Sequence, residues 1–305
     1  MDTDIVQIYK KNSTPLLPVP TGISPGLSPL PRIRAVAFDV YGTLFISESG
    51  DRSKLNGDNF RLFSRVLEHA GLTPATSAAG REAGRLFLEA IDTSHERDRT
   101  AGIEFPEVEI RDIWRRVLVR LNETGFISSP PADTSPSLCA AYYEVLSNPV
   151  YPMPRLSSTL DGLRDRGITL CIVSNAQFYT PELFPAFLGT GLEETGFDPG
   201  LCVWSYLLGR AKPDRLLYRD LSGRLSVHGI TPGETLYIGN DMLNDVYPAA
   251  QEGFRTALFA GDRRSLRLRE KELCSKNVKS DIIITDLSQL LEIIQYPNVG
   301  VNHET

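Results

Sequence analysis

Six short apolar runs, each closed by polar residues or glycine, form the clearest pattern along this chain. The first, at 35–40, stands alone; the later five are ITLCIVSN (168–175), LCVWSY (201–206), TLYIGN (235–240), RTALFA (255–260) and DIIITD (281–286). Runs that are apolar on both faces favour buried strands of a parallel sheet. Segments with helical spacing, for example 181–195, separate the later runs. The pattern therefore predicts an α/β fold with a doubly wound parallel sheet.

Between residues 50 and 150 the period changes. Apolar residues recur at helical spacing in FRLFSRVLEHAG (60–71), GREAGRLFLEAI (80–91), EIRDIWRRVLVRLNETG (109–125) and SLCAAYYEVLS (137–147), with no convincing strand among them. We predict a helical domain at 50–150, inserted into an α/β core made of 34–49 and 151–294, with a tail at 295–305. The two linkers, near Phe45–Gly50 and Pro149–Pro154, are expected to act as hinges.

The N-terminal segment differs from both. Residues 13–32 are dense in proline and show no helical period. Proline has no backbone N–H to donate to regular structure, so we predict that residues 1–33 are an extended or disordered leader.

Composition narrows the class of partner. The net charge is −6, without a long basic run, which argues against nucleic acid. No stretch approaches about 18 consecutive apolar residues, so no membrane span is expected. The four cysteines form no CxxC pair, which favours a reducing compartment, and a cytoplasmic location is expected. The oligomeric state stays open.

Polar side chains gather where the apolar runs end. In doubly wound sheets ligands bind at the carboxyl ends of the strands, so these side chains are expected to meet. They are Asp39, Tyr41, Thr43, Ser174, Asn175, Lys212, Asn240, Asp241 and Asp245. Carboxylates can act as nucleophiles or ligate Mg²⁺, hydroxyl and amide groups bind anionic oxygens, and a lysine offsets negative charge. The pattern predicts a site for a small anionic substrate.

Four segments carry a resemblance to a known family. FDVYGTLF (38–45), VSNAQ (173–177), GRAKPD (209–214) and YIGNDMLND (237–245) resemble, in order, the four motifs of the haloacid dehalogenase-like hydrolases. The resemblance extends from about residue 34 to 294, and the helical insertion stands where that family carries its helical cap domain. It implies a Rossmann-like core, a cap and hydrolase activity.

The resemblance also implies residue roles. Asp39 would be the nucleophile, and Thr43 and Ser174 would bind oxygens of the transferred group, with Asn175 assisting. Lys212 would balance the negative charge of nucleophile and substrate.

A magnesium site is implied as well. The backbone carbonyl of Tyr41 would ligate Mg²⁺ together with Asp39 and the last motif, in which Asn240, Asp241 and Asp245 are the candidates. Asn240 stands where a metal-binding aspartate is usual, and it brings one negative charge fewer.

Tyr41 separates the possible activities. Phosphatases of this family carry a second aspartate at this position as acid/base, and a phenol with a reference pKa of about 10 is a poor substitute. DxYGTL resembles the 2-haloacid dehalogenases, which need no metal. We expect a Mg²⁺-dependent phosphatase acting on a small phosphorylated metabolite. The alternatives are a metal-independent 2-haloacid dehalogenase and a catalytically weakened binding protein.

Overall fold

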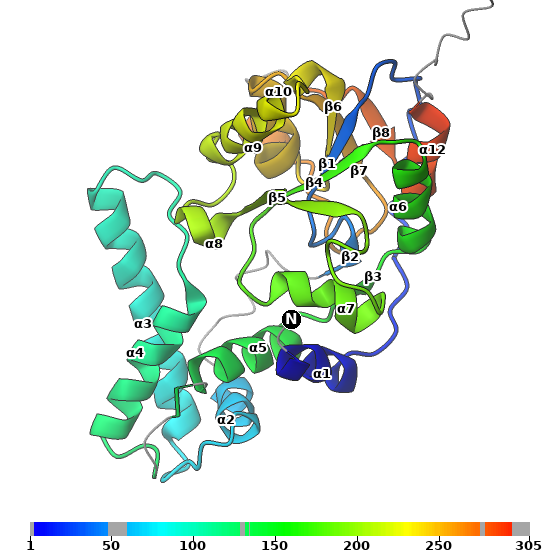
Figure 1. The fold of residues 1–305 in the computed structure, drawn as a ribbon. Coiled ribbons are helices and arrows are strands. Elements are labelled where there is room, and N and C mark those ends of the chain that lie inside the picture. Colours follow the sequence, from blue (N-terminus) through cyan, green and yellow to red (C-terminus); the bar gives the residue numbers. More distant parts are fainter. Residues whose placement is uncertain (1–2, 48–59, 129–131, 134, 275–277, 295–305) are drawn as a thin grey trace, which may run out of the picture.

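The computed structural model describes residues 3–47, 60–128, 132–133, 135–274 and 278–294. At its centre lies a six-stranded sheet in the order β5-β4-β1-β6-β7-β8, in which neighbouring strands run parallel (Figure 1). The strands are β1 (Ala35–Phe38), β4 (Thr169–Ser174), β5 (Phe197–Trp204), β6 (Thr235–Gly239), β7 (Arg255–Phe259) and β8 (Ile282–Ile284). All six predicted strands are confirmed.

Helices cover both faces of the sheet, because alternate strand residues pack into two different clusters. Val36 and Phe38 of β1 join the cluster that includes α6 (Leu156–Asp165) and α12 (Leu290–Ile293). Ala35 and Ala37 join the cluster that includes α9 (Leu216–Val227). A strand apolar on both sides requires this double cover, so the predicted doubly wound α/β fold is confirmed.

Short elements complete the core. They are α7 (Leu183–Phe187), α8 (Ser205–Leu208), α10 (Tyr247–Gln251), α11 (Glu270–Leu273), the 3₁₀ turns η2 (Thr180–Glu182), η3 (Pro232–Glu234) and η5 (Leu287–Gln289), and the π-helical turn η4 (Met242–Val246). The helix predicted over 181–195 was too long. It ends after Phe187, and Gly189 then adopts a φ of +80° that a helix cannot continue.

Four helices form the segment between the first and second parts of the core. They are α2 (Phe60–His69), α3 (Ala79–Thr100), α4 (Ile110–Glu123) and α5 (Ser135–Ser147), and they lie to one side of the sheet (Figure 1). At the junction, β2 (Phe45–Ile46) pairs antiparallel with β3 (Tyr151–Pro152), so the two linkers run side by side. The part of the predicted first hinge at 48–50 falls outside the described residues. No helix of the described part of the chain is long and apolar enough to cross a membrane.

The prediction of an extended or disordered N-terminal segment is wrong for residues 3–12. Residues 3–12 form α1 (Thr3–Asn12), which packs against α5 and α7. Ile5, Ile8 and Tyr9 are buried there, because apolar residues at helical spacing precede the prolines and supply one apolar face. Residues 13–33 contain no helix or strand, yet the Gly26 N–H donates to Ile283 O over 2.9 Å at the β8 edge.

Candidate active site

Asp39 directly follows β1, a strand that is paired on both sides near the middle of the sheet. Its side chain is almost buried, and its Oδ1 accepts two hydrogen bonds, from Ser174 Oγ over 3.0 Å and from Lys212 Nζ over 2.7 Å. Ser174 ends the neighbouring strand β4, so parallel pairing brings the two residues together. The strand-end prediction placed Asp39 and Ser174 at one site, and the structure brings them into contact.

Lys212 joins two buried carboxylates. Its ammonium group donates to Asp39 Oδ1 and to Asp245 Oδ1, each over 2.7 Å, and to the hydroxyl of Tyr237 over 2.8 Å. One ammonium group therefore forms ion pairs with two carboxylates. Burial opposes the charge on Lys212, but the two carboxylates outweigh it and raise the pKa of the lysine. Burial raises the pKa of the Asp245 carboxyl to about 6, against the lowering effect of Lys212.

A hydrogen bond connects the turn after β1 to the fourth motif, YIGNDMLND (237–245). The Gly42 backbone has a φ of +85°, and a Cβ there would lie 2.6 Å from Ser265 Cβ, so only glycine fits. Thr43 Oγ1 donates to Asn240 Oδ1 over 3.2 Å, and Asn240 Nδ2 donates to Ser265 O over 2.6 Å. Thr43 and Asn240 are therefore in contact, as their positions after β1 and β6 predict.

Tyr41 lines the site, and its surroundings make it a poor acid or base near neutral pH. Its hydroxyl lies 3.0 Å from Thr180 Oγ1. Burial raises the pKa of the phenol well above its ordinary value of 10, and Glu144 raises it further. The neutral phenol is held as a wall of the site.

Asn175 acts on the lysine loop in this structure. Its Oδ1 accepts the Lys212 backbone N–H over 2.8 Å, which fixes the start of the loop that presents the ammonium group. The expected contact between Asn175 and an oxygen of the transferred group remains a proposal.

Asp241 and Asp245 are both engaged by fixed cations and N–H groups. Arg269 donates to Asp241 Oδ2 through Nη2 over 2.7 Å and through Nε over 3.1 Å, and Asp241 Oδ1 caps η4 by accepting from Leu243 N over 2.8 Å. Asp245 Oδ2 accepts the Asp241 N–H over 2.9 Å. A Cβ on Gly239 would lie 2.3 Å from Asp245 Cγ, so glycine lets the carboxylate pack against β6.

These contacts decide which donors could hold a metal ion. Among the described residues, no three His, Cys, Asp or Glu side chains are grouped to bind one. Asp39 Oδ1 is occupied, but no described residue donates to Asp39 Oδ2, and the Asn240 amide oxygen accepts only the 3.2 Å bond from Thr43. With the Tyr41 backbone carbonyl, these oxygens are hard ligands of the kind Mg²⁺ takes when water and substrate complete its shell. The donor set fits Mg²⁺, with a single carboxylate.

A cavity of about 630 Å³ opens over Asp39, between the core and the helical segment. Besides the predicted residues, its lining includes His95 and Arg99 of α3. It also includes residues that the sequence did not single out, namely Phe105, Glu107, Glu144, Tyr179, Arg267 and Arg269. Helical periodicity in α3 and α5 shows an apolar face but does not say which face turns towards a cavity, so it gives no signal for the lining residues on these helices.

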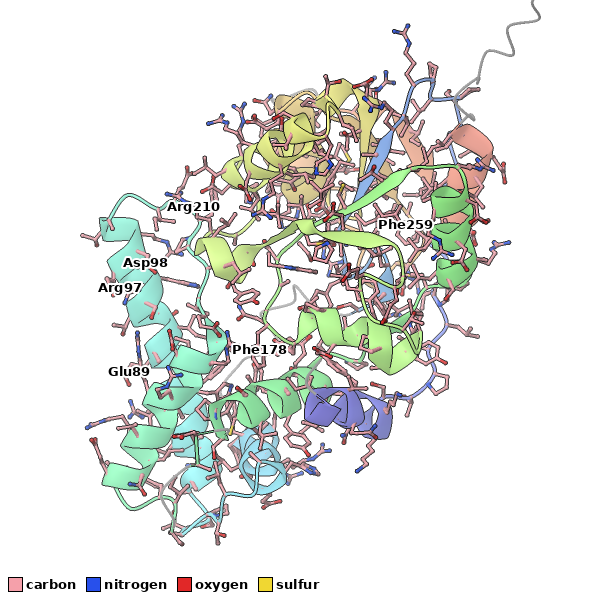
Figure 2. All side chains as sticks on the ribbon, in the orientation of Figure 1. Glu89, Arg97, Asp98, Phe178, Arg210 and Phe259 are labelled. Atoms are coloured by element: carbon pink, nitrogen blue, oxygen red, sulfur yellow. The ribbon has the colours of Figure 1, made fainter. Side chains whose placement is uncertain are left out.

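The α3–α4 loop closes one side of this cavity by direct contact with the core. Ala211 N donates to Phe105 O over 2.8 Å, next to Lys212, and Gln177 Nε2 donates to Val108 O over 2.8 Å. Phe178, labelled in Figure 2 between the helical segment and the core, receives the Arg111 guanidinium 4.4 Å from its ring centroid. The structure therefore shows the helical segment docked over the strand ends.

Comparison with known proteins agrees with this geometry. The family model of the haloacid dehalogenase-like hydrolases matches residues 33–253. A glyceraldehyde 3-phosphate phosphatase of Methanothermobacter thermautotrophicus is 27% identical over 153 residues, which are 50% of this chain and 63% of that protein, less than two thirds of its length. A HAD phosphatase of Thermococcus onnurineus superposes with a TM-score of 0.50 at 21% identity, over 88% of this chain and 100% of that one. An L-2-haloacid dehalogenase of Xanthobacter autotrophicus superposes with a TM-score of 0.46 at 19% identity, over 85% of this chain and 97% of that one.

Proposed function

This chain belongs to the haloacid dehalogenase-like hydrolases, and we propose that within this family it is a phosphatase for a small phosphorylated metabolite. The observation that carries the proposal is the carboxylate of Asp39, held through Oδ1 by Lys212 and Ser174 at the base of a large polar cavity. No described residue donates to its other oxygen, Oδ2, which leaves that oxygen for a metal ion. The likeness to a curated phosphatase over half the chain supports phosphate as the transferred group.

The reaction follows from these contacts. One carboxylate oxygen of Asp39 attacks phosphorus, the ester P–O bond breaks with its electron pair leaving on the alcohol oxygen, and an aspartyl phosphate forms. The hydroxyls of Thr43 and Ser174 and the ammonium of Lys212 bind the phosphoryl oxygens. Water then attacks phosphorus, the acyl phosphate P–O bond breaks, and inorganic phosphate leaves while the Asp39 carboxylate is restored.

Mg²⁺ would be held by Asp39, the Tyr41 carbonyl and Asn240, and when bound it would neutralise charge on the phosphate. We propose that Asp241 and Asp245 do not bind Mg²⁺ themselves but position the residues around it. Asp241 anchors Arg269 and caps η4, and Asp245 holds Lys212 in place. A ligand set with one carboxylate binds Mg²⁺ weakly alone, so the substrate phosphate is expected to complete the site.

The helical segment at 50–150 is proposed to be the cap. It reaches the core through the β2–β3 pair, and its α3–α4 loop contacts the loop that presents Lys212. Movement about the paired linkers would open the cavity for substrate and product, and closure would exclude water.

Metal-independent dehalogenation is the second candidate, and Tyr41 is the observation that favours it, because halide leaves without a proton. The cavity volume argues the other way. About 630 Å³ lies within the range of sites for whole metabolites, and a short haloacid fills only a small part of it.

The deciding experiment is a hydrolysis panel with Mg²⁺ and with EDTA. It contains 4-nitrophenyl phosphate, alkyl phosphates and 2-chloropropionate, and Asp39→Asn is the control. We expect Mg²⁺-dependent phosphate release, fastest from 4-nitrophenyl phosphate, because its leaving group needs no proton. Halide release in EDTA without phosphate release under any metal would establish the dehalogenase instead.

A further inference from the structure

One half-buried carboxylate in the cavity, Glu144, takes no part in the proposed reaction. Glu144 projects from α5 of the helical segment and lines the same cavity as Asp39. Its Oε1 accepts from Asn148 Nδ2 over 2.7 Å, and its Oε2 accepts from Tyr179 OH over 3.1 Å. Asn148 is itself oriented by Ser47, whose Oγ donates to the Asn148 amide oxygen over 2.9 Å. The carboxylate is therefore held in one position.

Both donors to Glu144 are neutral. No lysine, arginine or histidine of the described chain forms an ion pair with it, whereas Asp245 has Lys212 and Asp241 has Arg269. Burying a carboxylate without a counter-ion is costly. Burial raises the pKa of Glu144, and the hydrogen bonds from Asn148 and Tyr179 oppose the rise only in part. A positive charge beside Glu144 would remove this cost.

The walls beside Glu144 also suit a cation. The rings of Tyr41 and Tyr179 line the same cavity, and burial raises the pKa of both phenols well above the ordinary value, so they stay neutral. Aromatic faces attract ammonium groups, most strongly where water is excluded. Carboxylate and phenol rings together form a receptor of the kind that binds a protonated amine.

We propose that the substrate is a phosphate ester that also carries a protonated amine, and that Glu144 receives this amine while Asp39 receives the phosphate. The inference rests on the proposed phosphatase function and names its substrate class. Tyr41 lines the same cavity as Asp39 and Glu144, and its hydroxyl contacts Thr180, the neighbour of Tyr179 in sequence. The substrate needs a spacer between phosphate and amine that crosses this tyrosine.

The test compares ω-aminoalkyl phosphates with n-alkyl phosphates of matched length, over a series of increasing chain length. The measured quantity is the ratio of kcat/KM for amine over alkyl ester within each protein, because this ratio cancels general changes in the enzyme. In the wild type it should reach about tenfold or more at one chain length, as a charge-assisted hydrogen bond provides. In Glu144→Gln, which keeps the shape and removes the charge, the ratio should fall to about one.

Glu96→Gln is the matched control, since Glu96 is an exposed glutamate of α3 outside the cavity, and it should keep the wild-type ratio. Tyr179→Phe, which removes one donor from Glu144 and keeps the ring, gives a second variant should Glu144→Gln not fold. Equal rates for both ester series in the wild type would overturn the inference while leaving the phosphatase proposal intact. A preference that persists in Glu144→Gln would also overturn it. Absence of turnover on every ester, including 4-nitrophenyl phosphate with Mg²⁺, would overturn the phosphatase proposal itself.

Discussion

Replacing Lys212 by methionine should expose how the site balances its charges. Lys212 Nζ lies 2.7 Å from Asp39 Oδ1 and 2.7 Å from Asp245 Oδ1, and all three side chains are nearly buried. Methionine fills most of the volume but leaves two carboxylates facing each other without a cation. Breaking a buried ion pair by removing one partner costs about 3–5 kcal/mol, and we expect a loss of this size in the free energy of unfolding at pH 7.

The loss should depend on pH in a defined direction. The folded-state pKa of Asp245 is already raised to about 6 by burial, and without the lysine it rises further. A carboxyl whose folded pKa lies above its unfolded value, about 3.9, binds its proton more readily in the folded state, so the variant regains stability as pH falls from 7 towards 5. Urea unfolding at both pH values measures this.

The double variant Lys212→Met/Asp245→Asn is the control, because it removes one of the two stranded charges. It should recover a large part of the stability lost by Lys212→Met at pH 7. A single variant within about 1 kcal/mol of the wild type, or an equal loss at both pH values, would refute the charge balance that we describe.

Three further substitutions test neighbouring parts of the site. Tyr41→Asp should raise turnover of alkyl relative to aryl phosphates, because a carboxyl at this position can protonate the leaving group. An unchanged ratio would contradict the view that Tyr41 limits protonation of the leaving group. Asn240→Asp adds a charge to the metal ligands and should lower the Mg²⁺ concentration for half-maximal activity by about tenfold or more, and no shift would remove Asn240 from the ligand set. Gly239→Ala, with its Cβ 2.3 Å from Asp245 Cγ, should cost about 1–3 kcal/mol in urea unfolding. Gly223→Ala, with open space and an ordinary helical backbone, should be neutral or stabilising by up to about 1 kcal/mol, and equal effects at both glycines would contradict the close approach.

The α/β core and the sheet edge that carries the candidate site were predictable because one physical rule covers both. A parallel strand must be apolar on both faces, so its limits are visible in sequence, and the carboxyl ends of neighbouring strands meet at one edge. Asp39 and Ser174 could be placed together for this reason alone. Lys212 lies in a loop after such a run, so the rule indicated its place less directly, and the motif GRAKPD (209–214) supported it.

The side of the cavity formed by the helical segment could not be predicted in the same way. Periodicity shows that α5 has an apolar face, but the position of Glu144 depends on how α5 is docked, and docking is decided by contacts far apart in sequence. Tyr237 was hidden for another reason: it lies within the apolar run of β6, and its hydroxyl reaches Lys212 only because the strand passes beneath the lysine loop. The helix α1 was missed because the prolines after it dominated the interpretation.

The central claim is that Asp39 carries the phosphoryl group during turnover. The most direct measurement is an acid quench during steady-state hydrolysis of 4-nitrophenyl phosphate, followed by peptide mapping by mass spectrometry. We predict a phosphoryl group on Asp39 in the wild type, and in Asp39→Asn no such adduct, with turnover reduced by several orders of magnitude while the fold is kept. Undiminished turnover in folded Asp39→Asn, or a phosphoryl group trapped on another residue, would contradict the account.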